Sequence, residues 1–300
     1  MKLASMTGAD VGVSIAGIRI ALHGSDPVLE SLKAPRYSDF ICSAGDADIR
    51  LSIFDEPVDY RESDLPGNSQ VFDSGTVWSL YKTQSHMHIL LRSPGHGGAP
   101  YRMATFDRDL TRGEIVTFRG PGTEFPPEEH DPLEFPLSEV LMVCLLARGR
   151  GVMVHACGLD DLGRGLLFPG NSTDGKSTMA GLWKGSARIL NDDRIILRES
   201  EGAIRMYGTP WHGDMSDVSA EGTGLSSVYF LFHGSSNSVR SVSGAKAISM
   251  LLRRSFLPLW SRTGMEYSMD FLHSVAEQVP FHELDFVPDA GIVDFLKCGS

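Results

Sequence analysis

The sequence predicts a two-domain α/β protein, with a smaller β-rich N-terminal domain over residues 1–132 and an α/β domain over residues 133–300. Three observations support this division. Apolar side chains alternate with period 2 through the first part of the chain, and apolar strands alternate with helical stretches in the second. A stretch rich in proline, glycine and acidic residues, 120–132, separates the two patterns and is the expected linker.

The N-terminal domain is expected to consist mainly of strands. In segment 48–54, Ile49, Leu51 and Ile53 share one face, which is typical of a half-buried strand. The other segments with this character are 14–22, 76–81, 86–91, 101–107 and 114–119. A short polar connection joins 76–81 to 86–91, so these two segments predict a hairpin.

The C-terminal domain is expected to begin with a helix that has Ser138 as its N-cap and ends at Gly149. The strands and helices expected after it follow one another in alternation. Strands are predicted within 152–159, 165–170, 187–197, 228–234 and the tail, and helices within 177–184, 244–256, 265–277 and the last residues.

Composition excludes several classes of protein. Acidic residues outnumber basic ones by 38 to 27, and the resulting charge of −11 disfavours a nucleic-acid or membrane-surface partner. The four cysteines have no paired spacing typical of zinc or redox sites. Neither a secretory signal nor an apolar run of about 18 residues is present. We therefore expect a cytoplasmic protein without a membrane partner, and leave its oligomeric state open, a homo-oligomer included.

One motif carries specific chemistry, because it fits G-x-x-x-x-G-K-[ST] in full. It consists of Gly170, Asn171, Ser172, Thr173, Asp174, Gly175, Lys176 and Ser177, followed by Thr178. Such a loop wraps its N–H groups around a phosphate at the positive end of the following helix. Lys176 is placed to reach the β- and γ-phosphates, and the Ser177 hydroxyl to ligate Mg²⁺. The motif predicts binding of a nucleotide, with ATP and Mg²⁺ as the expected cofactors.

Three further residues are candidates for catalysis. Asp192 and Asp193 follow an apolar strand directly after the loop and its helix, where Mg²⁺ and a general base are expected. We assign Asp193 to the metal and Asp192 to the base, and keep the reverse order open. His155 lies in the strand before the loop. The basic residues Arg240, Arg253 and Arg254 either neutralise phosphate charge or form a solvated face.

The order of these residues resembles the kinase domain of HPr kinase/phosphorylase and its HPr kinase-like relatives in the PEP-carboxykinase-type P-loop group. The shared pattern comprises His155, Gly163-x-Gly165, a strand, the loop from Gly170 to Ser177, a helix, and Asp192-Asp193. It covers residues 155–197 well, and the rest only in general terms. The resemblance implies a mixed sheet with helices, in which the loop, the Asp pair and His155 surround one Mg·ATP site.

The sequence departs from this family at three places. Thr173 stands where the family loop has a glycine, and Asp174 adds a negative charge to the loop. The Glu/Arg-rich segment that follows the Asp pair in HPr kinases, and that bears on docking of HPr, is not found.

We expect an ATP-dependent kinase that phosphorylates a hydroxyl group of a protein, a peptide or a small molecule. The alternatives are a non-catalytic regulatory module that binds nucleotide, and a P-loop enzyme that hydrolyses ATP to drive motion.

Overall fold

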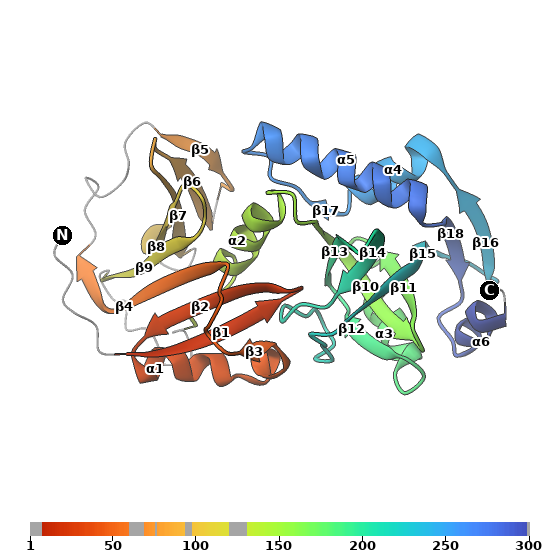
Figure 1. Ribbon diagram of the computed structural model, residues 1–300. Coiled ribbons are helices and arrows are strands. Elements are labelled where there is room, and N and C mark those ends of the chain that lie inside the picture. The colour runs from red at the N-terminus through yellow and green to blue at the C-terminus, as the bar shows by residue number, and fades with distance from the viewer. Residues whose placement is uncertain (1–7, 60–68, 76, 94–97, 120–130, 299–300) are drawn as a thin grey trace. The chain divides into compact units, whose positions relative to one another are not determined.

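The computed structural model describes residues 8–59, 69–75, 77–93, 98–119 and 131–298, which form a mixed α/β protein with two large mixed sheets (Figure 1). The chain packs as two compact units, here called the N-terminal unit (Met1–Met142) and the C-terminal unit (Val143–Ser300). The unit boundary falls within helix α2 (Leu137–Leu146), after the expected linker 120–132, most of which lies outside the described residues.

The N-terminal unit is built on one nine-stranded sheet in the order β3-β1-β2-β4-β9-β8-β7-β6-β5. The β2–β4 and β4–β9 pairs are parallel and the other neighbours are antiparallel, which includes the predicted β6–β7 hairpin. Short helical segments between β2 and β3 are α1 (Asp26–Glu30) and two 3₁₀ turns. The strands are β1 (Ala9–Ile15), β2 (Ile18–Gly24), β3 (Ile41–Cys42), β4 (Ile49–Asp59), β5 (Gln70–Asp73), β6 (Trp78–Lys82), β7 (His86–Ser93), β8 (Ala99–Asp107) and β9 (Arg112–Arg119).

Two local predictions for the first half of the chain are wrong. Segment 14–22 is not one strand but a tight hairpin, because Ala16 and Gly17 both adopt positive φ angles (53° and 74°) and reverse the chain. Ser138 is not an N-cap, because α2 already begins at Leu137. The same helix ends at Leu146, and Gly149, with a φ angle of +87°, lies in the turn that directly follows it.

The C-terminal unit is also built on a mixed sheet, in the order β11-β10-β13-β14-β15-β18-β16, with β12 and β17 paired to β10. In addition to the neighbours in this order, β11 pairs with β15. The β11–β15 and β15–β18 pairs are parallel. The strands are β10 (Val152–Asp161), β11 (Arg164–Pro169), β12 (Arg188–Asn191), β13 (Arg194–Ser200), β14 (Ala203–Tyr207), β15 (Gly222–His233), β16 (Ser238–Val242), β17 (Ser255–Phe256) and β18 (Phe281–Phe286). The helices are α3 (Lys176–Trp183), α4 (Gly244–Leu252), α5 (Arg262–Gln278) and α6 (Gly291–Cys298).

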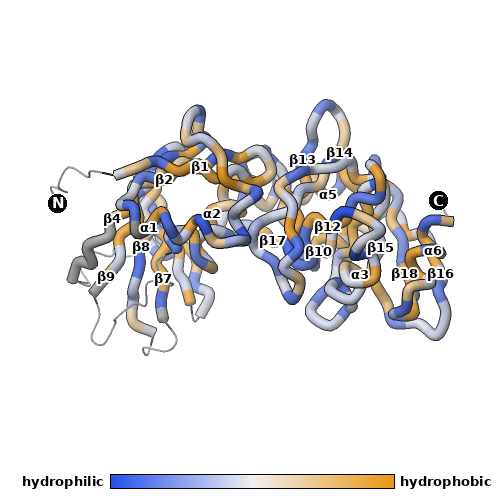
Figure 2. The backbone as a smooth tube through the Cα atoms, turned by 90° about the horizontal axis from the view of Figure 1, so that it is seen from below, coloured by the Kyte–Doolittle hydropathy of each residue, from blue (hydrophilic) through white to orange (hydrophobic). Residues whose placement is uncertain are grey.

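Helices cover both faces of this second sheet, and a separate apolar core lies under each pair. On one face Val154, Ile195 and Phe230 of the sheet pack in a cluster with residues of α4 and α5. On the other face Phe168 and Tyr229 cluster with residues of α3 and α6. Apolar residues recur along the strands of this sheet and in α6 (Figure 2). Within the described residues, no helix combines the length and the apolar character needed to cross a membrane.

The expected strand over 187–197 is interrupted at the Asp pair. β12 ends at Asn191 and β13 begins at Arg194, so Asp192 and Asp193 form the connection between two strands that both pair with β10. The Asn191 side-chain oxygen accepts hydrogen bonds from the N–H groups of Asp193 (2.7 Å) and Arg194 (2.8 Å). This local cap fixes the bend between the two strands, which lies beside the middle of β10, where the N–H of Ala156 donates to the Asp193 carbonyl (3.0 Å).

The core under α4 and α5 gives a direct test of the packing. Leu272 of α5 is completely buried, whereas Met269 on the same helix is 51% exposed. We expect Leu272→Ala to lower the free energy of unfolding by about 3–5 kcal/mol, because it removes buried methyl groups and leaves a cavity. Met269→Ala is the matched control and is expected to change it by less than about 0.5 kcal/mol. Urea denaturation measures both, and equal effects would contradict the placement of α5.

Candidate phosphate-binding site

The glycine-rich loop connects β11 to α3, as the motif requires. The N–H of Gly170 donates to the carbonyl of His155 (3.1 Å), which fixes the start of the loop on β10. The first hydrogen bond within α3 runs from the N–H of Met179 to the carbonyl of Gly175 (2.8 Å). The N–H groups of residues 176–178 precede that bond, so they are directed out of the helix N-terminus. A helix end of this kind favours a bound anion.

Gly175 is required at the point where the loop enters α3. Its φ angle of +102° lies in the region that L-residues avoid. A Cβ atom there would also approach within 2.7 Å of the Phe286 ring. Backbone conformation and packing therefore both demand glycine at this position.

Thr173 occupies a strained backbone position within the same loop. Its φ angle is +77°, a conformation that is rare for a β-branched residue. Glycine, which the HPr kinase pattern that the loop resembles has at this position, would adopt such an angle without strain. His233, at the end of β15, donates from Nε2 to the Thr173 carbonyl (3.3 Å) and stacks on Phe286. The sequence motif gave no indication of His233, because it lies 60 residues further along the chain.

Lys176 is held inside the loop rather than in solvent. Its Nζ donates to the carbonyl of Asn171 (2.9 Å), and the side chain is buried at the start of α3. Burial lowers the pKa of Lys176, and the nearby carboxylates of Asp193, Asp174 and Asp192 oppose that shift. These three carboxylates thus favour the charged form of Lys176.

Asp192 joins the loop to the segment 213–215. The carboxylate is 1% exposed and accepts a hydrogen bond from the Ser177 hydroxyl on Oδ2 (2.8 Å). It also accepts hydrogen bonds from the N–H groups of Gly213 (2.8 Å) and Met215 (3.1 Å). The contact between Ser177 and Asp192 brings together the motif and the acidic pair that the sequence placed separately.

Asp193, the second residue of the connection between β12 and β13, contacts His155 of β10. His155 Nε2 donates to Asp193 Oδ1 (2.7 Å), and the Arg194 guanidinium pairs with Oδ2. Burial raises the pKa of Asp193, but the His155 hydrogen bond and the charges of Arg194, His155 and Lys176 outweigh it and hold the pKa below its usual value. Asp193 is therefore ionised at neutral pH, and His155 fixes its orientation.

The sequence left open whether its arginine candidates neutralise phosphate charge or form a solvated face. In the structure, Arg240 and Arg254 differ in exposure and in partners. Arg240 is 60% exposed and pairs with Glu283 and Asp285. Arg254 is 12% exposed and lies beside the loop, with Nη2 3.6 Å from Asp174 Oδ2. Asp174 itself turns inward and accepts a hydrogen bond from the N–H of Asn171 (2.6 Å).

These residues fit a magnesium–nucleotide complex. Ser177 and Asp192 offer neighbouring hydroxyl and carboxylate oxygens, the donor atoms that Mg²⁺ prefers. Among the residues described, no group of three or more His, Cys, Asp or Glu side chains is arranged to hold a metal by itself. A Mg²⁺ ion bound through one or two side chains plus substrate phosphates needs no such group.

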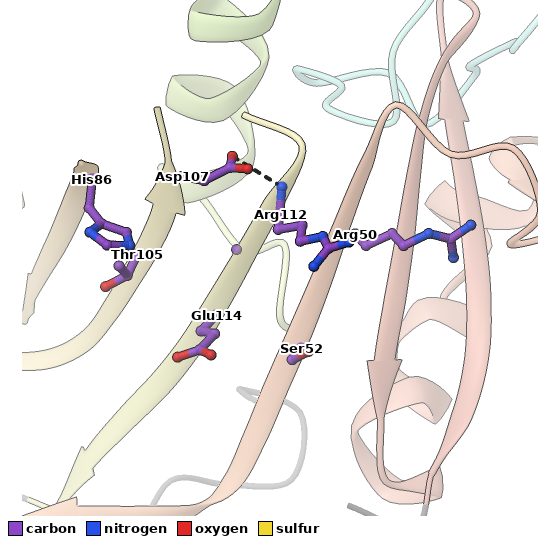
Figure 3. A pocket seen from close by; sticks show the side chains of 8 residues that line it. Arg50, Ser52, His86, Thr105, Asp107, Arg112 and Glu114 are labelled. Carbon is purple, nitrogen blue, oxygen red and sulfur yellow. Dashed lines mark hydrogen bonds between the residues drawn. The ribbon is translucent and has the colours of Figure 1, made fainter. Parts of the chain in front are cut away.

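A separate pocket of about 500 Å³ lies on one face of the N-terminal sheet (Figure 3). Its Asp107 carboxylate accepts hydrogen bonds from the N–H groups of Thr111 (2.7 Å) and Arg112 (3.2 Å), so it is engaged in the β8–β9 turn. The lining residues are Arg50, Ser52, His86, Thr105, Asp107, Arg112, Gly113 and Glu114. We assign this mixed-charge pocket no ligand.

No protein-family model matches this chain, and a search of curated proteins finds no match either. The resemblance to HPr kinases therefore stays a prediction from the motif.

The loop predicts that nucleotide affinity depends on Lys176. Lys176→Ala removes a charged contact to the β- and γ-phosphates, and we expect it to weaken Mg·ATP binding by about 1.5–3 kcal/mol. Lys184→Ala, at the other end of α3 and paired with Asp217 at the surface, is the matched control and is expected to leave the affinity unchanged. Calorimetric titration measures both, and an unchanged affinity in Lys176→Ala would contradict the phosphate-binding role of the loop.

Proposed function

We propose that the C-terminal unit binds Mg·ATP and transfers its γ-phosphoryl group to a hydroxyl of a protein, a peptide or a small molecule. The observation that carries this proposal is the hydrogen bond between Ser177 of the loop and Asp192 of the acidic pair. It joins a phosphate-binding element to two carboxylates, of which the second is oriented by His155. A site that only bound phosphate has no evident use for an oriented, ionised carboxylate beside it.

Binding of the nucleotide would rest on the loop. The N–H groups at the start of α3 donate to the phosphates, and Lys176 exchanges its bond to the Asn171 carbonyl for contacts to phosphate oxygens. Because the lysine is already held at the loop by that bond, little side-chain entropy is lost when it binds. The buried position of its ammonium group strengthens the attraction to phosphate relative to an exposed lysine.

The metal would be held by Ser177 and Asp192. This reverses the order favoured from the sequence, which gave the metal to Asp193 and the base to Asp192. Asp192 is the carboxylate that contacts the loop hydroxyl, whereas Asp193 is engaged with His155 and Arg194. When bound, Mg²⁺ supplies positive charge that offsets the charge on the transferring phosphoryl group.

Asp193 is the group that receives the acceptor hydroxyl. An ionised carboxylate would accept the hydroxyl hydrogen bond, orient the oxygen for attack and take its proton as the bond to the γ-phosphorus forms. The bond from that phosphorus to the β,γ-bridging oxygen breaks at the same time, and ADP leaves. His155 keeps the carboxylate in place through its 2.7 Å hydrogen bond. Most of the rate enhancement then comes from positioning and charge, as in other phosphoryl transfers.

A regulatory module that binds nucleotide without transfer is the second candidate. The observation that favours it is the inward position of Asp174, whose charge faces the loop in which a phosphate would bind. In that case the only role of Asp192 and Asp193 would be to hold the loop in place. If the protein is a kinase, an Asp193 variant that still binds nucleotide loses phosphoryl transfer. If it is a regulatory module, the native protein transfers no phosphoryl group.

The test is transfer of ³²P from ATP to acceptors in a cell extract, followed by single-turnover kinetics. Asp193→Asn keeps the shape of the side chain but removes a proton acceptor, so we expect transfer to fall by about 10²–10⁴-fold with ATP binding little changed. Asp192→Asn is expected to weaken Mg²⁺ binding.

Asp270→Asn, an exposed change of the same charge on α5, is the control and should leave transfer unchanged. If the native protein binds ATP but transfers phosphate to no acceptor, the regulatory module replaces the kinase.

A further inference from the structure

Asp174 places a negative charge inside the loop. Its Oδ2 accepts a 2.6 Å hydrogen bond from the N–H of Asn171 and lies 3.6 Å from Nη2 of Arg254. The side chain also packs against Gly170, where an added Cβ would approach Asp174 Cβ within 2.9 Å. The carboxylate therefore lies across the loop rather than in solvent, and uses a loop N–H group as an anion would.

Arg254 is a buried cation whose hydrogen-bonding capacity is only partly used. Nη1 donates to the Met250 carbonyl (3.0 Å) and the guanidinium lies over the Phe230 ring (5.3 Å to its centroid). Nε is buried and has no hydrogen-bond partner among the described residues, and the separation from Asp174 is longer than a hydrogen bond. A guanidinium has five N–H donors, so this one is suited to a further anionic partner.

The backbone links Arg254 directly to the start of the loop. The N–H of His155 donates to the Arg254 carbonyl (2.6 Å), and the His155 carbonyl accepts the N–H of Gly170 (3.1 Å). Two hydrogen bonds thus hold the backbone of this arginine at a fixed position relative to the loop. The Met250 carbonyl and the Phe230 ring hold its guanidinium, so little ordering of the side chain is needed on binding.

We propose that Asp174 is an internal anion that holds Arg254 in the resting protein, and that a nucleotide phosphate displaces it and takes Arg254 as a ligand. This rests on the proposed function, since it concerns the same loop. The side chains of Lys176, Arg194 and Arg254 balance the carboxylates of Asp174, Asp192 and Asp193 in the resting site. When the Asp174 carboxylate moves out, the remaining groups carry a net positive charge that favours phosphate.

The proposal makes Asp174 a residue that limits affinity for phosphates. Its carboxylate must leave both Arg254 and the Asn171 N–H before a phosphate can use them, and it repels an anion while it stays. Only ligands with enough phosphate charge, such as pyrophosphate or the tail of a nucleoside triphosphate, make up for this loss. Inorganic phosphate, with one phosphate group, is expected to bind much more weakly.

The experiment is calorimetric titration of the full chain with Mg²⁺-pyrophosphate and with Mg·ATP. Asp174→Asn keeps an oxygen that can accept from Asn171 but removes the charge, so we expect affinity to increase by about tenfold or more. Asp73→Asn removes the same charge from another turn, where Asp73 accepts from the N–H of Gly75 (2.8 Å), and is expected to have no effect.

A double-mutant cycle then tests the shared partner. In an Arg254→Met background, the gain from Asp174→Asn is expected to fall to less than about threefold, because no guanidinium is released. Arg254→Lys replaces Arg254→Met in the cycle if thermal unfolding shows that the latter does not fold. Independent, additive effects of the two changes would overturn the proposal, as would an unchanged or weaker affinity in Asp174→Asn.

These outcomes separate this proposal from the proposed function. If the native protein binds Mg·ATP and Asp174→Asn binds no tighter, only the internal-anion role fails. If neither protein binds pyrophosphate or ATP, both proposals fail.

Discussion

The buried carboxylate of Asp192 is the constraint on which the candidate site depends. It accepts hydrogen bonds from Ser177 of the loop and from the N–H groups of Gly213 and Met215, so two segments distant in sequence meet at one side chain. An almost fully buried carboxylate is stable only when its oxygens are satisfied, and here three donors serve that purpose. Removing its charge would loosen the start of α3 and the 213–215 segment together.

The surroundings of Asp192 combine this structural role with a chemical one. Gly213 packs so closely that an added Cβ would lie 3.0 Å from Asp192 Oδ2, which keeps a side chain out of this part of the site. The three carboxylates favour the charged form of Lys176, and Arg194 and Arg254 balance the remaining charge. Asp192, Asp193 and Arg194 are thus held in place before any ligand arrives, and the proposed phosphoryl transfer would benefit from charges that need little reorganisation.

The sequence predicted the parts of the site that follow from local rules. The loop from Gly170 to Ser177, the strand before it and the helix after it are specified by glycine positions and hydrophobic pattern, and the structure contains all three elements. The Asp pair was also found, because it directly follows an apolar strand. The sequence did not predict that the strand expected over 187–197 breaks at this pair, since the Asn191 cap that bends the chain there is recognisable only from its hydrogen bonds.

Other features depend on tertiary contacts that no local pattern records. His233 and Arg254 reach the loop from β15 and from the end of α4, and neither residue lies in a motif. The choice between Asp192 and Asp193 as metal ligand also depends on which carboxylate faces Ser177, a matter of strand register. In the N-terminal unit, the single strand expected over 14–22 failed because Ala16, an unusual residue for a positive φ, takes part in the turn.

The measurement that tests the account most directly is a crystal structure of the full chain with Mg²⁺ and a non-hydrolysable ATP analogue. The account predicts phosphate oxygens within about 2.7–3.2 Å of the N–H groups of residues 175–178 and of Lys176 Nζ, with the metal beside Ser177 and Asp192. An empty loop at saturating ligand concentration, with Lys176 still bound to the Asn171 carbonyl, would contradict it.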